Sequence, residues 1–203
     1  MHGGDIKNII ILFLLLGSFL FASPPDWEDS PGEYESTSWI VAGIVQHNGI
    51  TMAGAGDMFA AFDAADNVRG VAVKNTASFG PYMGQTYYEM TMRSNTPGEP
   101  LSFKYYDASA DEVLDISGTY TFVANDQLGG IDSPVFFGEF WVLYDFEDDL
   151  VAGFQFNIDG ISVTGGSGGA AADAGFSVSA SGSVVIGFSI LGSIIPAGSG
   201  VLT

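Results

Sequence analysis

Cysteine is absent from this chain of 203 residues. Without cysteine there is no disulfide framework, no thiol nucleophile and no thiolate ligand for zinc. Basic residues are scarce too: Lys and Arg number 5 against 24 Asp and Glu, and the formal net charge is −19. Because so negative a surface repels nucleic acid and anionic lipid, we expect no nucleic-acid partner. We also expect the hydrophobic core alone to hold the fold together.

Histidine occurs only 2 times in the chain. His47 stands beside Asn48-Gly49, a pair typical of a hairpin turn, and a histidine at such a turn is most simply a solvated surface residue. A Ser-His-Asp triad would have to use His47, and zinc or copper would need several His or Cys ligands. We therefore predict no catalytic residue. The paired carboxylates of a glycoside hydrolase stay open as an alternative, without a specific motif to support them.

Long hydrophobic runs are missing except near the N-terminus. Lys7 precedes an apolar run over residues 9–21, and the small residue Ala22 follows it. The run is shorter than the ~20 residues that a membrane-spanning helix needs. This pattern is typical of a secretory signal peptide, which we place at residues 1–22. We predict a protein that is secreted or displayed at the cell surface, with no membrane span after signal removal.

The composition and the hydropathy pattern of the chain change after the N-terminal region. Residues 23–37 are rich in Pro, Asp, Glu and Ser, which predicts an acidic linker. From Trp39 onward, short apolar or alternating runs are separated by turn-forming residues at intervals of about 10 residues. This spacing predicts an all-β fold, an antiparallel β-sandwich. A single helical turn is expected only at 108–114. The expected strands are 38–46, 57–63, 68–74, 85–93, 100–107, 119–124, 134–144, 151–158, 161–164, 175–180 and 183–190.

The composition shifts near residue 145. Aromatic residues and Met dominate before this point, whereas Gly, Ser, Ala and Val dominate after it. We therefore expect one β-sandwich module at 38–137 and a second β module at 138–203. The segment 194–203 reads as a turn followed by the start of a strand, and an unfinished strand would leave an unpaired edge. This pattern predicts an incomplete second module and a sequence that is a fragment of a longer chain.

The segment 57–73 consists of two apolar runs around a short polar turn, which predicts a β-hairpin. It carries Arg69, one of the few basic residues. We expect Arg69 to pair with a carboxylate, Asp57 or Asp63, and to have a structural role. Gly70 follows it and would let the backbone bend or approach a neighbour closely.

Two oxygen-rich turns are candidate calcium sites, because hard cations bind several carboxylate and carbonyl oxygens on one turn. The first candidate set is Asp107, Asp111 and Asp115, and the second is the turn that carries Asp63 and Asp66. Asp and Asn also favour turns because their side chains hydrogen-bond to the nearby backbone. Calcium is therefore one interpretation of these residues, and turn formation is the other.

Aromatic residues are candidates for stacking on sugar rings. Alternation along the strands puts Tyr87 and Tyr106 on the side opposite the expected core, since successive side chains point to opposite faces. We predict these two tyrosines as ligand-binding residues, and packing within the core or between modules is the alternative. The wider set of candidates is Trp27, Trp39, Tyr82, Tyr87, Tyr106 and Trp141.

Several motifs together resemble a known kind of module. Residues 56–63, 68–72, 93–95 and 101–115 are similar to an uncharacterised β-sandwich module of large secreted or surface proteins of environmental bacteria. The resemblance covers about 38–137. It implies a secreted β-sandwich and carries over no catalytic residue.

The second half resembles the opening of a cohesin-like sandwich, of the superfamily shared with carbohydrate-binding modules. The motifs that carry this resemblance are 149–158, 175–178, 185–189 and 195–202. It implies a partial cohesin-like module over about 140–203.

Together these observations predict a non-catalytic secreted or cell-surface module that contacts protein or glycan, in a structural or adhesive role and with calcium as a possible ligand. A carbohydrate-binding module of a polysaccharide-degrading system is the alternative. A glycoside hydrolase is the second alternative.

Overall fold

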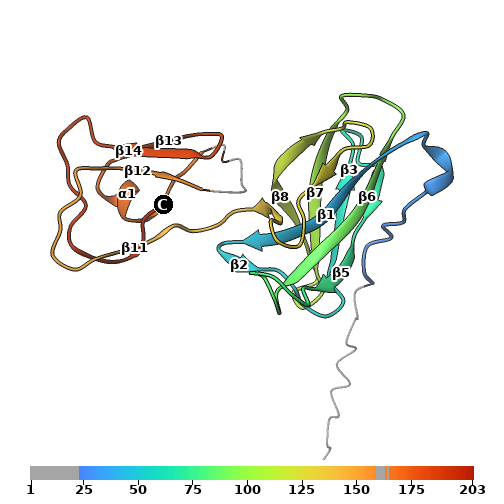
Figure 1. Ribbon diagram of the computed structural model, residues 1–203, viewed down its shortest axis with the longest axis horizontal. Helices are drawn as coiled ribbons and strands as arrows, with labels where there is room; N and C mark the ends of the chain where they lie inside the picture. Colours follow the sequence, from blue (N-terminus) through green and yellow to red (C-terminus); the bar gives the residue numbers. More distant parts are fainter. Residues whose placement is uncertain (1–22, 159–162, 164) are drawn as a thin grey trace, which may run out of the picture.

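The computed structural model describes residues 23–158, 163 and 165–203 (Figure 1). The predicted signal peptide lies outside the described residues, and so does the expected strand at 161–164 except for Val163. The described chain is mostly β structure in antiparallel sheets, which confirms the all-β prediction. In these described ranges, no helix is long and apolar enough to cross a membrane.

The first sheet is built around the long strand β1 (Ser36–His47). It has 6 strands, with the order β10-β1-β6-β5 and with β2 and β9 also paired to β1. Strands β9 and β10 run parallel to β1, so the sheet is antiparallel with two parallel additions. Its other strands are β2 (Ile50–Thr51), β5 (Val73–Thr76), β6 (Thr86–Ser94), β9 (Gln127–Leu128) and β10 (Val135–Gly138).

The second sheet has 4 strands in the order β4-β3-β7-β8. Strands β3 (Met58–Phe62) and β4 (Val68–Val71) pair antiparallel, which confirms the predicted hairpin. Strands β7 (Pro100–Asp107) and β8 (Glu112–Thr121) form the next hairpin. The helical turn expected at 108–114 is wrong: residues 108–111 form a turn, and β8 begins directly after it. Asp111 ends this turn with a φ of 54°, which a helix does not allow.

The two sheets enclose one core. Phe59 of β3 packs against Tyr88 of β6 with ring centroids 5.6 Å apart, and Phe103 of β7 packs against Phe137 of β10 at 4.6 Å. These contacts join side chains of opposite sheets, so the arrangement is sandwich-like. In β6 the buried positions follow the alternation read from the sequence, whereas β3 is buried at four successive positions, Phe59 to Phe62. The buried core residues are Ile40, Val45, Phe59, Ala61, Tyr88, Met90, Met92, Leu101, Phe103, Tyr105, Ile116, Tyr120, Phe122 and Phe137.

Gly70 lies where the chain crosses from one sheet to the other. It belongs to β4 at the edge of the second sheet, and β5 begins only a few residues later in the first sheet. A Cβ atom at Gly70 would lie 2.5 Å from the carbonyl oxygen of Thr91 on β6. The corner therefore needs a residue without a side chain, which confirms the close approach predicted for Gly70.

Residues 142–203 form a smaller group of strands with a core of its own. Strands β12 (Gly153–Asn157), β14 (Val184–Phe188) and β13 (Ser177–Ser181) make a 3-stranded sheet, and β11 (Leu143–Phe146) pairs with β15 (Gly198–Val201). The short helix α1 (Gly169–Asp173) packs beside them. The strand predicted near the end of the sequence is thus present and is paired along β11. The buried residues of this second core are Ala171, Phe176, Ile195 and Leu202.

The segment predicted as an acidic linker lies against the sandwich. Trp27 packs edge-on against Phe62 with ring centroids 5.2 Å apart. Asp29 pairs with Arg93 of β6, where Nε lies 2.8 Å from the carboxylate. A short 3-10 turn, η1 (Pro31–Glu33), then leads into β1. Despite its polar composition, this segment is attached by aromatic and ionic contacts.

Candidate functional site

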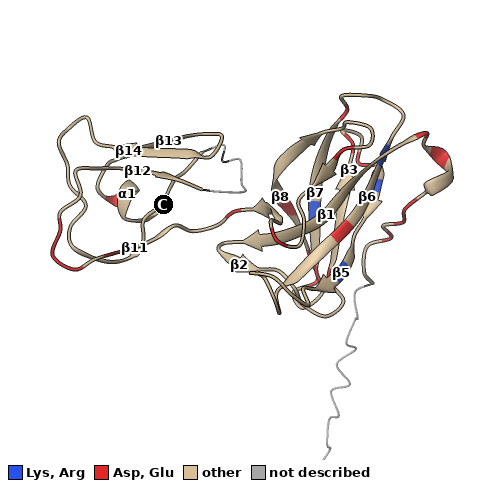
Figure 2. Cartoon of the chain, viewed as in Figure 1, with Lys and Arg blue, Asp and Glu red and all other residues tan. Residues whose placement is uncertain are grey.

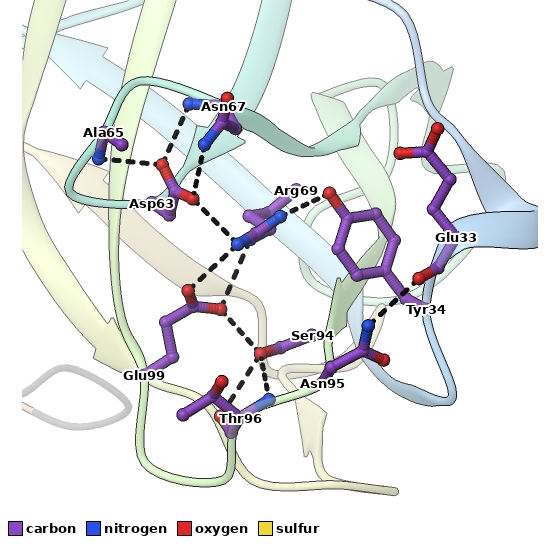
Figure 3. A network of polar contacts seen from close by, with 10 residues as sticks. All are labelled: Glu33, Tyr34, Asp63, Ala65, Asn67, Arg69, Ser94, Asn95, Thr96 and Glu99. Atoms are coloured by element: carbon purple, nitrogen blue, oxygen red, sulfur yellow. Dashed lines mark hydrogen bonds and ion pairs between the residues drawn. The ribbon is translucent and has the colours of Figure 1, made fainter.

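Arg69 is the centre of the most connected polar network in the sandwich (Figure 3). Its guanidinium lies 2.7 Å from Asp63 and contacts Glu99 twice, at 3.0 and 3.2 Å. It also donates to the hydroxyl of Tyr34 and lies 4.7 Å from the centroid of that ring. Of the two partners predicted for Arg69, Asp63 pairs with it, whereas Asp57 contacts Tyr105 and Ala108. The contacts with Glu99 and Tyr34 were not apparent in the sequence, because these residues are about 30 positions away.

The network continues into the turn between β6 and β7. The hydroxyl of Ser94, which is fully buried, donates to Glu99 at 2.6 Å and accepts from the backbone N–H of Thr96 at 2.9 Å. The side chain of Asn95 donates to the carbonyl of Glu33 at 3.0 Å. Figure 3 shows these residues around Arg69. The network therefore links the N-terminal segment, the β3–β4 hairpin and the β6–β7 turn.

The carboxylate of Asp63 is occupied by donors of its own turn. Oδ1 accepts the backbone N–H groups of Ala65 and Asn67, and Oδ2 accepts the side-chain amide of Asn67 and pairs with Arg69. Burial acts to raise the pKa of Asp63, but the hydrogen bonds from Asn67 and Ala65 and the charge of Arg69 outweigh it, and the pKa lies below its ordinary value. A carboxylate held in its charged form by four donors is suited to fixing a turn.

The remaining members of the calcium sets are dispersed. Asp66, in the turn that also carries Asp63, pairs with Lys104 at 2.8 Å. In the other loop, Oδ1 of Asp107 accepts hydrogen bonds from the backbone N–H and the hydroxyl of Ser109, which hold the pKa of Asp107 below its ordinary value. Asp111 accepts the hydroxyl of Tyr106 at 3.0 Å, and Asp115 lies in β8, opposite Lys104.

These contacts show that the turn-forming interpretation accounts for Asp63 and Asp107. Within residues 23–158, 163 and 165–203, no group of three or more His, Asp or Glu side chains is placed to hold one metal ion. Calcium binding by either loop stays a prediction, which calcium titration calorimetry would test.

Tyr87 and Tyr106, the two predicted ligand-binding tyrosines, lie in different sheets. Tyr87 belongs to β6 in the first sheet, whereas Tyr106 belongs to β7 in the second. Tyr106 is only 5% exposed, and its hydroxyl is bonded to Asp111. Burial and this carboxylate raise its pKa. The two tyrosines therefore do not form one stacking platform, and Tyr87 alone has an accessible ring.

Tyr87 instead joins an aromatic group on the outer face of the first sheet. Tyr82, in the loop between β5 and β6, lines the same small recess as Tyr87. The ring of Tyr82 packs against Phe136 of β10 with centroids 6.2 Å apart. On β5 and in the loop that joins it to β6, three apolar side chains are strongly exposed: Val73 at 62%, Phe79 at 54% and Met83 at 69%. We call these six residues the contact surface. Tyr82 is one of the aromatic candidates from the sequence, whereas Phe79 and Met83 have no signal there.

A cleft of about 540 Å³ adjoins the contact surface at Phe136. It lies between the sandwich and the strands that follow, and Phe140, Trp141 and Phe156 contribute its other aromatic walls. Its size falls within the range of about 300–1,000 Å³ found for small-molecule sites. Trp141, which is 52% exposed, packs against Gly49 at the β1–β2 turn. The cleft thus brings the exposed ring of Trp141 together with the half-buried rings of Phe136, Phe140 and Phe156.

A second buried polar chain connects Asp57 with two tyrosines of the core. The hydroxyl of Tyr105 donates to Asp57 at 2.6 Å and lies 2.8 Å from the hydroxyl of Tyr88. The hydroxyl of Tyr88 in turn donates to the carbonyl of Met52 at 3.1 Å. Asp57 also accepts the backbone N–H of Ala108 at 2.9 Å. Burial, together with the hydrogen bonds to Asp57 and Tyr88, raises the pKa of Tyr105. The sequence offers no signal for this chain, because alternation identifies Tyr105 only as a core residue.

Each basic side chain of the sandwich is engaged within the molecule. Arg69 and Arg93 pair with carboxylates, Lys104 pairs with Asp66, and Lys74 donates to the carbonyls of Ala53 and Gly54. These four are the only Lys and Arg residues after position 7. Figure 2 shows the few basic residues among many acidic ones. The potential presented to a partner is therefore strongly negative.

No protein-family model, curated protein or solved structure matches this chain.

Proposed function

We propose that the protein is a non-catalytic, secreted or cell-surface module that makes contact with another protein or with a glycan. The contact surface is the site of this interaction. The observation that carries the proposal is the exposure of Val73, Phe79 and Met83 on β5 and on the β5–β6 loop, the loop that also carries Tyr82. Contiguous exposed apolar surface is uncommon on soluble proteins and marks interaction sites.

The aromatic composition also supports a contact role. Tyr, Phe and Met are enriched at the buried centres of protein interfaces, and the aromatic rings contribute a large area at a low entropic cost. Tyr82 is held by Phe136, and Tyr87 is held within a strand. Such preorganised rings lose little conformational freedom when a partner binds.

Glycan binding is a second candidate, and the cleft beside Phe136 favours it. Trp141 and Phe140 line this cleft together with the polar side chains of Ser117, Glu139 and Thr203. Aromatic walls with a few polar groups are the usual composition of a small-molecule site. In this version of the proposal, the protein is a carbohydrate-binding module and Trp141 stacks on the sugar.

The test uses the full chain without its predicted signal peptide on arrays of glycans and of extracellular proteins. Tyr87→Ala and Phe79→Ser should abolish a protein contact, whereas Trp141→Ala should abolish a glycan contact. Leu191→Ser is the matched control, because Leu191 is 85% exposed but lies outside both surfaces. A ligand whose binding is unaffected by all three site variants would contradict the proposal.

A further inference from the structure

We infer that the partner at the contact surface is a basic protein segment, in which apolar side chains alternate with Lys or Arg. This inference rests on the proposed function and names the chemistry of the partner at that same surface. It follows from two observations: acidic side chains flank the contact surface, and every Lys and Arg side chain of the sandwich already has a partner within the molecule.

The apolar centre requires an apolar counterpart. Phe79 and Met83 are 54% and 69% exposed, and both lie in the loop that joins β5 and β6. This loop is closed by two hydrogen bonds, from the N–H of Ala77 to the carbonyl of Gln85 and from the N–H of Gly84 to the carbonyl of Ala77, so its side chains are presented from an ordered base. Covering side chains of this size removes apolar area from water, which favours binding.

Two carboxylates flank this centre. Glu89 stands directly opposite Val73 in the β5–β6 ladder and accepts the hydroxyl of Tyr87 at 3.4 Å. Burial and the charge of Glu89 raise the pKa of Tyr87. At the other end, the carboxylate of Asp132 lies against Gly80, the residue after Phe79. Both acids are exposed.

The Lys and Arg side chains of the sandwich, which could pair with Glu89 and Asp132, contact other groups. Arg69, Arg93 and Lys104 each pair with another carboxylate, and Lys74, the residue after Val73, bonds to backbone carbonyls. Charge complementarity across an interface selects partners and speeds association. A partner that brings its own Lys or Arg therefore satisfies Glu89 and Asp132, whereas an anionic partner is repelled by the net charge of −19.

The apolar residues of the second unit provide the contrast. Ile190 and Leu191 are even more exposed, at 83% and 85%, but no charged residue follows Asp173 in the sequence. An apolar probe without charge should bind there as readily as at the contact surface. A basic apolar probe should prefer the contact surface.

The experiment measures the binding of a ten-residue peptide of alternating Lys and Phe to the full chain by fluorescence anisotropy. The comparison peptides replace Lys with Glu or with Gln. We expect the Lys peptide to bind most tightly and to weaken as salt rises. Phe79→Ser should weaken it about ten- to a hundredfold. The matched control, Leu191→Ser, should leave its affinity unchanged.

Acid variants of equal charge separate local recognition from general attraction. Glu89→Gln with Asp132→Asn should weaken the Lys peptide about three- to tenfold. Asp145→Asn with Asp148→Asn changes the net charge by the same amount and should have a smaller effect. Equal losses for the two pairs, or equal affinity for the Lys and Gln peptides, would overturn the inference. A neutral glycan or protein whose binding depends on Phe79 but not on these acids would overturn the inference and still support the proposed function.

Discussion

Replacing Arg69 with Met tests whether the network around it holds the sandwich together. Met keeps most of the aliphatic volume and removes the charge. The side chains of Arg69, Asp63 and Glu99 are only 13%, 8% and 16% exposed. Without Arg69, the two carboxylates would stay mostly buried and lose their common cation. Tyr34 would also lose its contact with the guanidinium.

The expected cost follows from this burial. Removing one partner of a buried ion pair typically destabilises a protein by about 3–5 kcal/mol, because the remaining charge is uncompensated. Asp63 retains the donors of its own turn and Glu99 retains Ser94, so we expect the lower part of this range, about 3 kcal/mol. For a domain of this size, that loss lowers Tm by roughly 12–24 °C.

Urea unfolding at pH 7, followed by tryptophan fluorescence and by circular dichroism, measures this loss. The control is Lys104→Met, since Lys104 pairs with Asp66, which is 71% exposed, and exposed pairs contribute about 0–1 kcal/mol. Adding Glu99→Gln to Arg69→Met should restore part of the stability. Equal and small effects of Arg69→Met and Lys104→Met would refute the reasoning that burial of the network determines its contribution.

Three further predictions concern the fold. Gly70→Ala should destabilise the fold by about 1–3 kcal/mol in the same assay, because the new Cβ would lie 2.5 Å from the carbonyl oxygen of Thr91. Gly153→Ala is the control, because its Cβ would lie 3.4 Å from the nearest atom, and equal losses of stability in the two variants would contradict the prediction. Tyr105→Phe should cost about 1–3 kcal/mol, since Asp57 loses a buried donor, whereas Tyr87→Phe should change stability by less than about 0.5 kcal/mol. Because the pKa of Asp63 is lowered in the fold, its stabilisation is present above the ordinary value of 3.8 and is lost as the pH falls through the folded pKa. The difference in unfolding free energy between wild type and Asp63→Asn should therefore shrink from pH 7 to pH 3, and a difference that stays constant over this range would disprove the prediction.

The β-strands were predictable because alternation is a local property. Leu101, Phe103 and Tyr105 are spaced by two residues, and this spacing alone places them on one buried face. The hairpin of β3 and β4 was predictable for the same reason, and so was the pairing of Arg69 with Asp63, which lies a few residues away. Strands β9 and β10 pair in parallel with β1, and such pairing joins distant segments without a turn signal.

The candidate site was predictable only in part. Alternation places Tyr87 and Tyr106 outward, yet Tyr106 is covered at the 107–111 turn while Tyr87 stays accessible. Whether an outward side chain is covered depends on loops from elsewhere in the chain. The placing of Tyr82 beside Tyr87 and Phe136 likewise depends on how the β5–β6 loop folds onto the sheet.

The sequence alone determined the all-β class, the buried face of β6 and the negative charge, because composition and a period of two residues specify these locally. The tertiary structure decided which partners meet: Glu99 and Tyr34 with Arg69, Tyr105 with Asp57, and the acidic N-terminal segment with the sandwich. It also decided that an exposed apolar surface lies between two acids. These contacts join residues that are distant in sequence, and only the packing of two sheets brings such residues together.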